Sequence, residues 1–154
     1  MTTYHSTRNA EKTLTASQAI LQGIAPDGGL YVPDHIPALD IALDHLPDMT
    51  YQELAYDVMK KFFDDFTEEE LKHCVNAAYD DKFDDSSIVP LVKAGGHHYL
   101  ELFHGPTIAF KDMALSILPH LLTTSAKKNG STKEIVILTA TSGDTGKAAL
   151  VGFA

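Results

Sequence analysis

Lys111 is the residue whose setting suggests covalent chemistry. It follows an apolar pair in FHGPTIAFKD (residues 103–112), where a loop is expected to become a helix. An ammonium in the first turn of a helix costs about 0.3–1 kcal/mol, because it faces the positive end of the helix dipole. The helix terminus and partial burial both favour the free amine, which is the nucleophile that forms a Schiff base. A solvated surface lysine is the alternative interpretation.

The stretch TSGDTG (residues 141–146) is the second candidate site. It joins a predicted strand to a predicted helix, so the open amides of that helix point at whatever occupies the loop. Its two glycines let the backbone approach a ligand, and its hydroxyl side chains add donors. Such a loop suits a carboxylate or a phosphate. An ordinary capped turn is the alternative, and the spacing matches neither a P-loop nor a dinucleotide-binding glycine motif.

Other polar residues are weaker candidates. His97 and His98 are adjacent, so they point to opposite faces of a strand, and no metal site is predicted there. The DDKFDD run (residues 80–85) lacks the spacing of a calcium loop and is interpreted as a solvated loop. His104 is a packing residue or lines the site. Arg8 is a surface residue or meets an anion from the site.

Three capping boxes predict helices in the first half of the chain. They are TASQ (residues 15–18), TYQE (residues 50–53) and TEEE (residues 67–70). Apolar residues at helical spacing after the second and third boxes predict buried faces. The residues expected to be buried in this N-terminal helical layer are Leu54, Val58, Phe62, Leu71 and Val75.

The pattern changes near residue 86. Residues 97–104 are predicted to form a strand, and residues 111–128 a helix that Pro119 kinks or divides. Residues 134–140 (EIVILTA) are predicted to form a strand buried on both faces. The fold class is therefore α/β. A mainly helical region (residues 1–85) precedes the start of a parallel-sheet domain (residues 86–154). One such unit cannot cover both faces of a sheet, so a longer protein is expected.

The composition excludes several functions. The 154-residue chain has a net charge of -9, which repels nucleic acid and anionic membranes. It has one cysteine and no apolar run long enough to span a membrane or to act as a secretory signal. These features predict a cytoplasmic protein without nucleic-acid or membrane partners.

The motifs ELFHGPTIAFKD and TATSGDTGKAA together resemble the threonine synthases, pyridoxal-phosphate enzymes of fold type II, the tryptophan-synthase-β-like fold. YHSTRN and AILQGIAPDGGLYVP in the first half resemble the long form of that family. The resemblance implies that Lys111 binds pyridoxal 5'-phosphate as a Schiff base and moves protons. It also implies a substrate-binding loop, in which Asp144 lies near the cofactor, formed by Thr141, Ser142, Gly143, Asp144 and Thr145.

The implied reaction converts O-phosphohomoserine and water to L-threonine and phosphate. A phospho-lyase that releases an oxo acid from the same substrate is one alternative, and a non-catalytic anion-binding domain is another. The groups that hold the cofactor phosphate and face its pyridine nitrogen are expected downstream of Ala154, so this chain alone is expected to be inactive. Asn9 and Pro119 depart from the family pattern. No feature of the sequence indicates an oligomeric state.

Overall fold

A small antiparallel sheet organises the start of the chain. The structure is a computed structural model that describes residues 1–154. Its first three strands are paired in the order β2-β1-β3, with bounds β1 Tyr4–Ser6, β2 Thr13–Leu14 and β3 Tyr31–Pro33. Helix α1 (Ala16–Gln22) packs beside this sheet, and its Ala16 and Ala19 are buried with Tyr4.

The three predicted capping boxes are all confirmed. Helices α1, α2 (Tyr51–Met59) and α3 (Glu68–Ala78) each begin after a threonine whose hydroxyl accepts from the N3 amide. In α3 the Glu70 amide donates to Thr67 Oγ1 at 3.2 Å, and the Thr67 amide donates to Glu70 Oε2 at 2.9 Å. Each helix therefore starts where its local sequence satisfies otherwise unpaired amides.

Replacing Thr67 with alanine is expected to lower the free energy of unfolding by about 1 kcal/mol, because the Glu70 amide loses its acceptor. Urea denaturation measures this change. Thr123→Ala is the control: Thr123 is exposed inside a helix, where alanine has the higher helix propensity. Equal losses from both variants would contradict the capping role.

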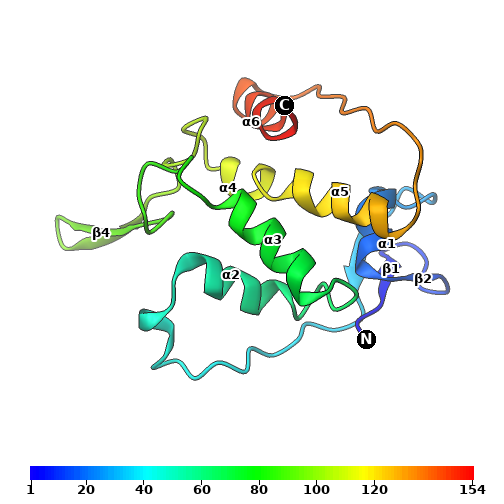
Figure 1. Cartoon of the computed structure of the whole chain (residues 1–154), viewed down its shortest axis with the longest axis horizontal. Helices are drawn as coiled ribbons and strands as arrows, with labels where there is room; N and C mark the ends of the chain where they lie inside the picture. The colour runs from blue at the N-terminus through cyan, green and yellow to red at the C-terminus, as the bar shows by residue number, and fades with distance from the viewer.

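The core lies between α3 and α5 (Leu118–Lys128). Leu71, Cys74, Val75 and Ala78 of α3 are at most 2% exposed, which confirms two of the predicted core residues. Figure 1 shows α3 lying between α2 and α5, with α6 (Gly143–Phe153) on the far side of α5.

The predicted buried face of α2 is wrong by one residue. Val58 is 39% exposed, and Leu54 and Phe62 are only half-buried. The face that packs on the core carries Tyr51 and others at the same spacing of four, namely Ala55, Met59 and, just beyond the helix, Phe63. The Tyr51 ring meets that of Tyr79 edge-on at 4.9 Å. The aromatic residues at the two ends of this buried face, Tyr51 and Phe63, therefore set the rotation of the helix about its axis.

The second half contains a hairpin and three helices. Strands β4 (Leu91–Ala94) and β5 (His97–Leu100) pair antiparallel, so the strand predicted for residues 97–104 ends early. The predicted division of the helix around Pro119 is confirmed, because α4 (Asp112–Leu115) precedes α5 and Pro119 lies in the first turn of α5. The 3-10 helix η1 (Leu46–Asp48) precedes α2. No helix combines the length and apolar character that a membrane span requires.

The strand predicted for residues 134–140 is not formed. These residues make an extended connection between α5 and α6 (Figure 1), and Val136 and Leu138 are 78% and 91% exposed. A buried strand needs neighbours that satisfy its amides and carbonyls, and within residues 1–154 no strand pairs with this segment. The chain is thus a mixed α/β structure in which both sheets are antiparallel.

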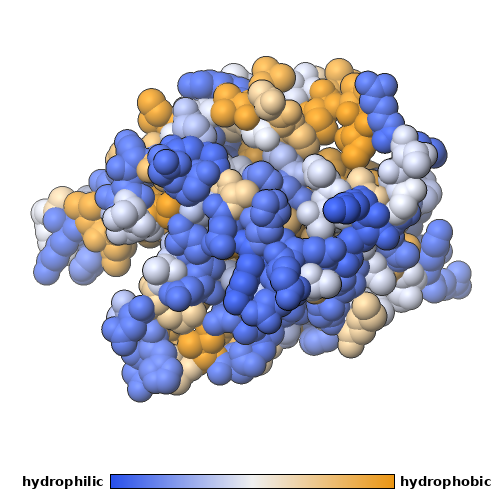
Figure 2. All heavy atoms as spheres, viewed as in Figure 1, coloured by the Kyte–Doolittle hydropathy of each residue, from blue (hydrophilic) through white to orange (hydrophobic).

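Apolar side chains gather on the surface at two places. Figure 2 shows them over α6 with the connection before it, and along the β4–β5 hairpin. The exposed apolar residues there include Val136, Leu138, Leu150, Leu91 and Leu100. Contiguous apolar surface of this kind marks a region that another surface covers.

Candidate functional site

Lys111 lies at the start of a helix, as predicted. It is the N-cap residue of α4, with φ -64° and ψ -20°, and its side chain is half-buried. Its Nζ lies over the Phe110 ring, 4.7 Å from the centroid. The side chain forms no hydrogen bond or ion pair, so its amine is available to a ligand.

The loop before Lys111 is closed by a buried carboxylate. Asp112 is 2% exposed, and its two oxygens accept from the Thr107 amide at 2.8 Å and the Thr107 hydroxyl at 2.6 Å. Gly105 packs so closely that a Cβ there would lie 2.5 Å from Asp112 Cβ. Ile108, between them, has φ +62°. The sequence interpretation missed this arrangement, for which the only signal was a threonine five residues before an aspartate.

His104 connects this loop to the acidic run. Its Nδ1 lies 2.5 Å from Asp84 Oδ1 and its Nε2 lies 2.9 Å from Glu101 Oε2. The Asp84 amide also donates to the His104 carbonyl at 3.0 Å. The 80–85 run is therefore only partly a solvated loop, because Asp84 holds His104 and Phe83 is buried. His104 itself packs beside the site loop.

The two carboxylates raise the pKa of His104, first through the Glu101 hydrogen bond and then through Asp84. The pKa of His120 is lowered, first by burial and then by the nearby Lys82 and His73. NMR titration is therefore expected to give His104 a midpoint above 6.5 and His120 a midpoint below it. Coincident midpoints would contradict the contacts of both.

The sign of the stability effect follows from the raised pKa of His104. The protonated imidazole binds its two carboxylates only when folded, so its stabilisation is complete below the unfolded pKa near 6.5. That stabilisation is lost as pH rises through the folded pKa. The deficit of His104→Gln relative to wild type in urea denaturation should thus shrink as pH rises from below 6.5 through the raised pKa of folded His104. A deficit independent of pH would contradict this ion-pair role.

The stretch at residues 141–146 is mostly the first turn of a helix. Helix α6 begins at Gly143, and its N-cap Ser142 makes no side-chain capping bond. Residues 141–144 are exposed, and the Gly146 amide is the first to bond within the helix, to the Ser142 carbonyl at 3.0 Å. The amides before it are open, and Asp144 stands beside them. This is the geometry of an anion site at a helix N-terminus.

The helices that carry the two motifs, α4 and α6, pack against each other. Lys147 of α6 donates from Nζ to the Thr107 carbonyl at 3.2 Å. Helix α6 packs on α4, and Gly152 lies against the Leu115 carbonyl. The Lys111 amine faces Phe110 and makes no contact with residues 141–146 themselves. The motifs are thus neighbours joined through Thr107.

The remaining candidates lie away from these motifs. Arg8 donates to the Asp27 carbonyl at 3.0 Å and packs on Gly28, so it fixes a turn beside the first sheet. His97 and His98 lie on the exposed hairpin.

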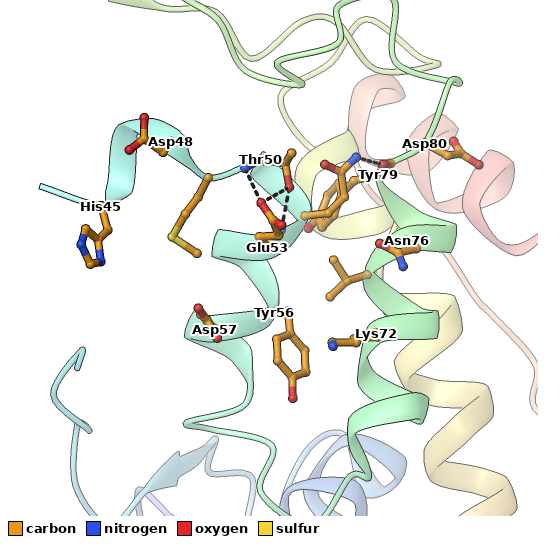
Figure 3. A pocket seen from close by; sticks show the side chains of 13 residues that line it. His45, Asp48, Thr50, Glu53, Tyr56, Asp57, Lys72, Asn76, Tyr79 and Asp80 are labelled. Atoms are coloured by element: carbon orange, nitrogen blue, oxygen red, sulfur yellow. Dashed lines mark hydrogen bonds between the residues drawn. The ribbon is translucent and has the colours of Figure 1, made fainter. Parts of the chain in front are cut away.

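A groove of about 1000 Å³ lies between α2 and α3 (Figure 3). Thr50 and Glu53 on its wall form the capping box, and Gln52 Nε2 donates to the Tyr79 carbonyl at 2.5 Å. Neither Lys111 nor residues 141–146 line it. Several of its polar groups bond within or between the two helices, so we place the candidate site at the two motifs instead.

The structure is thus a mixed α/β protein in which a half-buried lysine starts one helix and open N-terminal amides start a second helix packed against it. The family model described as Threonine synthase N terminus matches residues 3–79, half of the chain. The chain therefore belongs to the threonine synthase family.

Similar proteins support this membership along at least 95% of the chain. The threonine synthase of Saccharomyces cerevisiae is 37% identical over 97% of this chain and 32% of that protein. The threonine synthase of Corynebacterium glutamicum is 42% identical over 95% of this chain and 32% of that protein. The crystal structure of PLP-bound threonine synthase from Brucella melitensis matches with a TM-score of 0.86 and 35% identity, covering 99% of this chain and 33% of that one. The chain thus spans about a third of the length of these relatives.

Proposed function

We propose that this chain is the N-terminal third of a threonine synthase, which converts O-phosphohomoserine and water to L-threonine and phosphate with pyridoxal 5'-phosphate. The observation that carries the proposal is the 37% and 42% identity to named threonine synthases over at least 95% of the chain. The PLP-bound neighbour supports the cofactor. We call the product of the full reading frame that contains this chain the longer protein.

The chain has groups that fit two parts of the ligands, namely the aldehyde of the cofactor and the carboxylate of the substrate. Lys111 supplies an amine with no competing hydrogen bond, which suits the cofactor aldehyde. The open amides at the start of α6 suit a carboxylate, and we assign the substrate carboxylate to Thr141, Ser142, Gly143, Asp144 and Thr145. Asp144 is assigned a second contact, to the cofactor. When bound, pyridoxal phosphate supplies an electron sink that stabilises negative charge at the substrate Cα.

Lys111 has two roles in this proposal. Its amine holds the cofactor before substrate arrives, and once released it removes the proton from Cα of the substrate. Tethered beside that atom, the same amine can move protons as phosphate leaves and water adds at Cβ. Residues 141–145 hold the carboxylate so that the proton faces Lys111.

We further propose that residues 1–85 form an N-terminal region and that residues 86–154 begin the cofactor domain. Residues 134–140 would then become a strand of a parallel sheet once later residues provide its neighbours. The support is their β-branched, nearly continuous apolar sequence together with the high exposure of Val136 and Leu138 in this chain. A cytoplasmic location is part of the proposal, and the single buried Cys74, which has no disulfide partner, is compatible with it.

The test is to purify the longer protein with the cofactor and to assay it with O-phosphohomoserine. Threonine and phosphate in equal amounts are expected. An oxo acid in place of threonine would instead indicate a phospho-lyase, and a colourless protein without turnover would indicate a non-catalytic binding domain.

The 154-residue chain alone is expected to lose the cofactor on desalting and to release no phosphate. The phosphate of the cofactor carries nearly two negative charges, and the net charge of -9 adds no attraction. Stoichiometric retention with turnover by the short chain would contradict the proposal that it is incomplete.

A further inference from the structure

We propose that Asp112 is a positioning residue for Lys111, acting through Thr107, and that Lys147 fastens the same threonine to α6. The inference rests on the proposed function of Lys111 and adds to it the groups that hold this lysine in place.

The first support is the cost of burying Asp112. A carboxylate that is 2% exposed has lost nearly all its hydration, and no cation lies within ion-pair distance of it. Both of its oxygens are instead used by Thr107, at 2.8 and 2.6 Å. A favourable charge at the start of a one-turn helix needs no burial, because an exposed aspartate supplies the same attraction to the helix dipole. The burial therefore points to a role in the loop.

The second support is that the loop would not hold its shape unaided. Ile108 has φ +62°, which is costly for a β-branched residue. Gly105 leaves no room for a Cβ beside the Asp112 side chain, which lies 2.5–2.9 Å from the position such an atom would take. The two hydrogen bonds from Thr107 to Asp112 close the loop around these residues. Lys111, between Phe110 and Asp112, is thereby fixed at the start of α4.

The third support is that all three polar groups of Thr107 are used. Its amide and hydroxyl donate to Asp112 of α4, and its carbonyl accepts from Lys147 Nζ of α6 at 3.2 Å. Thr107 is therefore the junction between the helix that presents the amine and the helix that presents the open amides. Through it, the Lys111 loop and residues 141–146 keep a fixed relative position.

A positioning role predicts a specific kinetic signature. A misplaced amine slows proton transfer while the substrate carboxylate still binds at α6, so kcat should fall with KM nearly unchanged. A merely structural role would lower the yield of folded, cofactor-loaded protein and leave kcat per bound cofactor unchanged.

The experiment compares Thr107→Val, Thr107→Ser and Asp112→Asn in the longer protein, with the exposed Thr132→Val as control. We expect kcat per bound cofactor to fall about tenfold or more in Thr107→Val and on the order of 10²-fold in Asp112→Asn, with KM within about twofold of wild type. Thr107→Ser keeps the hydroxyl and should recover kcat to within about threefold. Lys147→Met removes only the hydrogen bond from the exposed Lys147 to the Thr107 carbonyl, and its kcat should lie between those of wild type and Thr107→Val.

A second readout needs no activity. In the cofactor-free longer protein, an amine-reactive label is followed at Lys111 by mass spectrometry, with the exposed Lys93 as internal reference. Freed from its loop, Lys111 should react faster in Thr107→Val and Asp112→Asn, approaching the rate of Lys93. If the wild type makes no threonine, the proposed function fails while this labelling still tests the positioning. The inference would be overturned if Thr107→Val and Asp112→Asn both kept the wild-type kcat per bound cofactor. It would also be overturned if Lys111 were labelled at the wild-type rate in both of these variants.

Discussion

Replacing Lys111 with alanine in the longer protein is expected to remove the bound cofactor and to slow threonine formation at least about 10³-fold. The physical reason is that one side chain supplies both the covalent attachment and the proton transfers. Absorbance at the visible band of the cofactor after desalting measures the first, and phosphate release from O-phosphohomoserine measures the second.

Two further variants separate the nucleophile from the charge. Lys111→Arg keeps a cation over the Phe110 ring but offers no amine that can be deprotonated, so it should be as inactive as alanine. Lys93→Ala removes an exposed lysine of β4 and should leave cofactor and rate unchanged. If Lys111→Ala kept the wild-type amount of cofactor and the wild-type turnover, the covalent attachment would have to be at another lysine.

Local signals in the sequence predicted those parts of the fold that local interactions decide. A capping box is complete within four residues, so Thr15, Thr50 and Thr67 could be identified without any knowledge of their neighbours. Pro119 likewise acts on its own turn, because it lacks the amide that a continuous helix needs, and it divides α4 from α5 as predicted.

Parts of the fold that depend on distant partners were predicted less well. The rotation of α2 is set by the contact of Tyr51 with Tyr79, which lies at the end of α3. The predicted buried face through Val58 was therefore wrong by one residue. Residues 134–140 have the composition of a buried strand, but composition cannot supply the neighbouring strands that would pair with them. Both errors concern interactions that a linear pattern does not contain.

The candidate site shows the same division. Lys111 was placed at a helix start and residues 141–146 at the start of another helix, because turn and helix signals surround them. The groups that join the motifs were missed, since the Lys147–Thr107 contact spans 40 residues. The contact of His104 with Asp84 spans 20 residues and was missed for the same reason. The sequence thus indicated where the candidate residues lie on their helices, whereas their supporting contacts are visible only in the structure.

Gly152→Ala is expected to lower activity on the order of 10²-fold in the longer protein, although it lies outside both motifs. A Cβ at Gly152 would overlap the backbone carbonyl oxygen of Leu115 and lie 3.4 Å from Pro119 Cγ. Because backbone cannot rotate away as a long side chain can, α6 must move off α4 by on the order of 1 Å. That shift carries the open amides of α6 away from Lys111, and overpacking of this kind also costs about 1–3 kcal/mol of unfolding free energy.

Gly143→Ala is the matched control for stability, because it changes the same residue type in the same helix. A Cβ at Gly143 meets no atom within 4 Å, so urea denaturation should show a change of less than about 1 kcal/mol in either direction. Gly152→Ala should instead lower both the urea midpoint and kcat, and a Gly152→Ser variant should do so at least as strongly. Wild-type kcat in Gly152→Ala would mean that α6 does not need its close approach to α4 in the working enzyme, and the junction of the two motifs would then have to lie elsewhere.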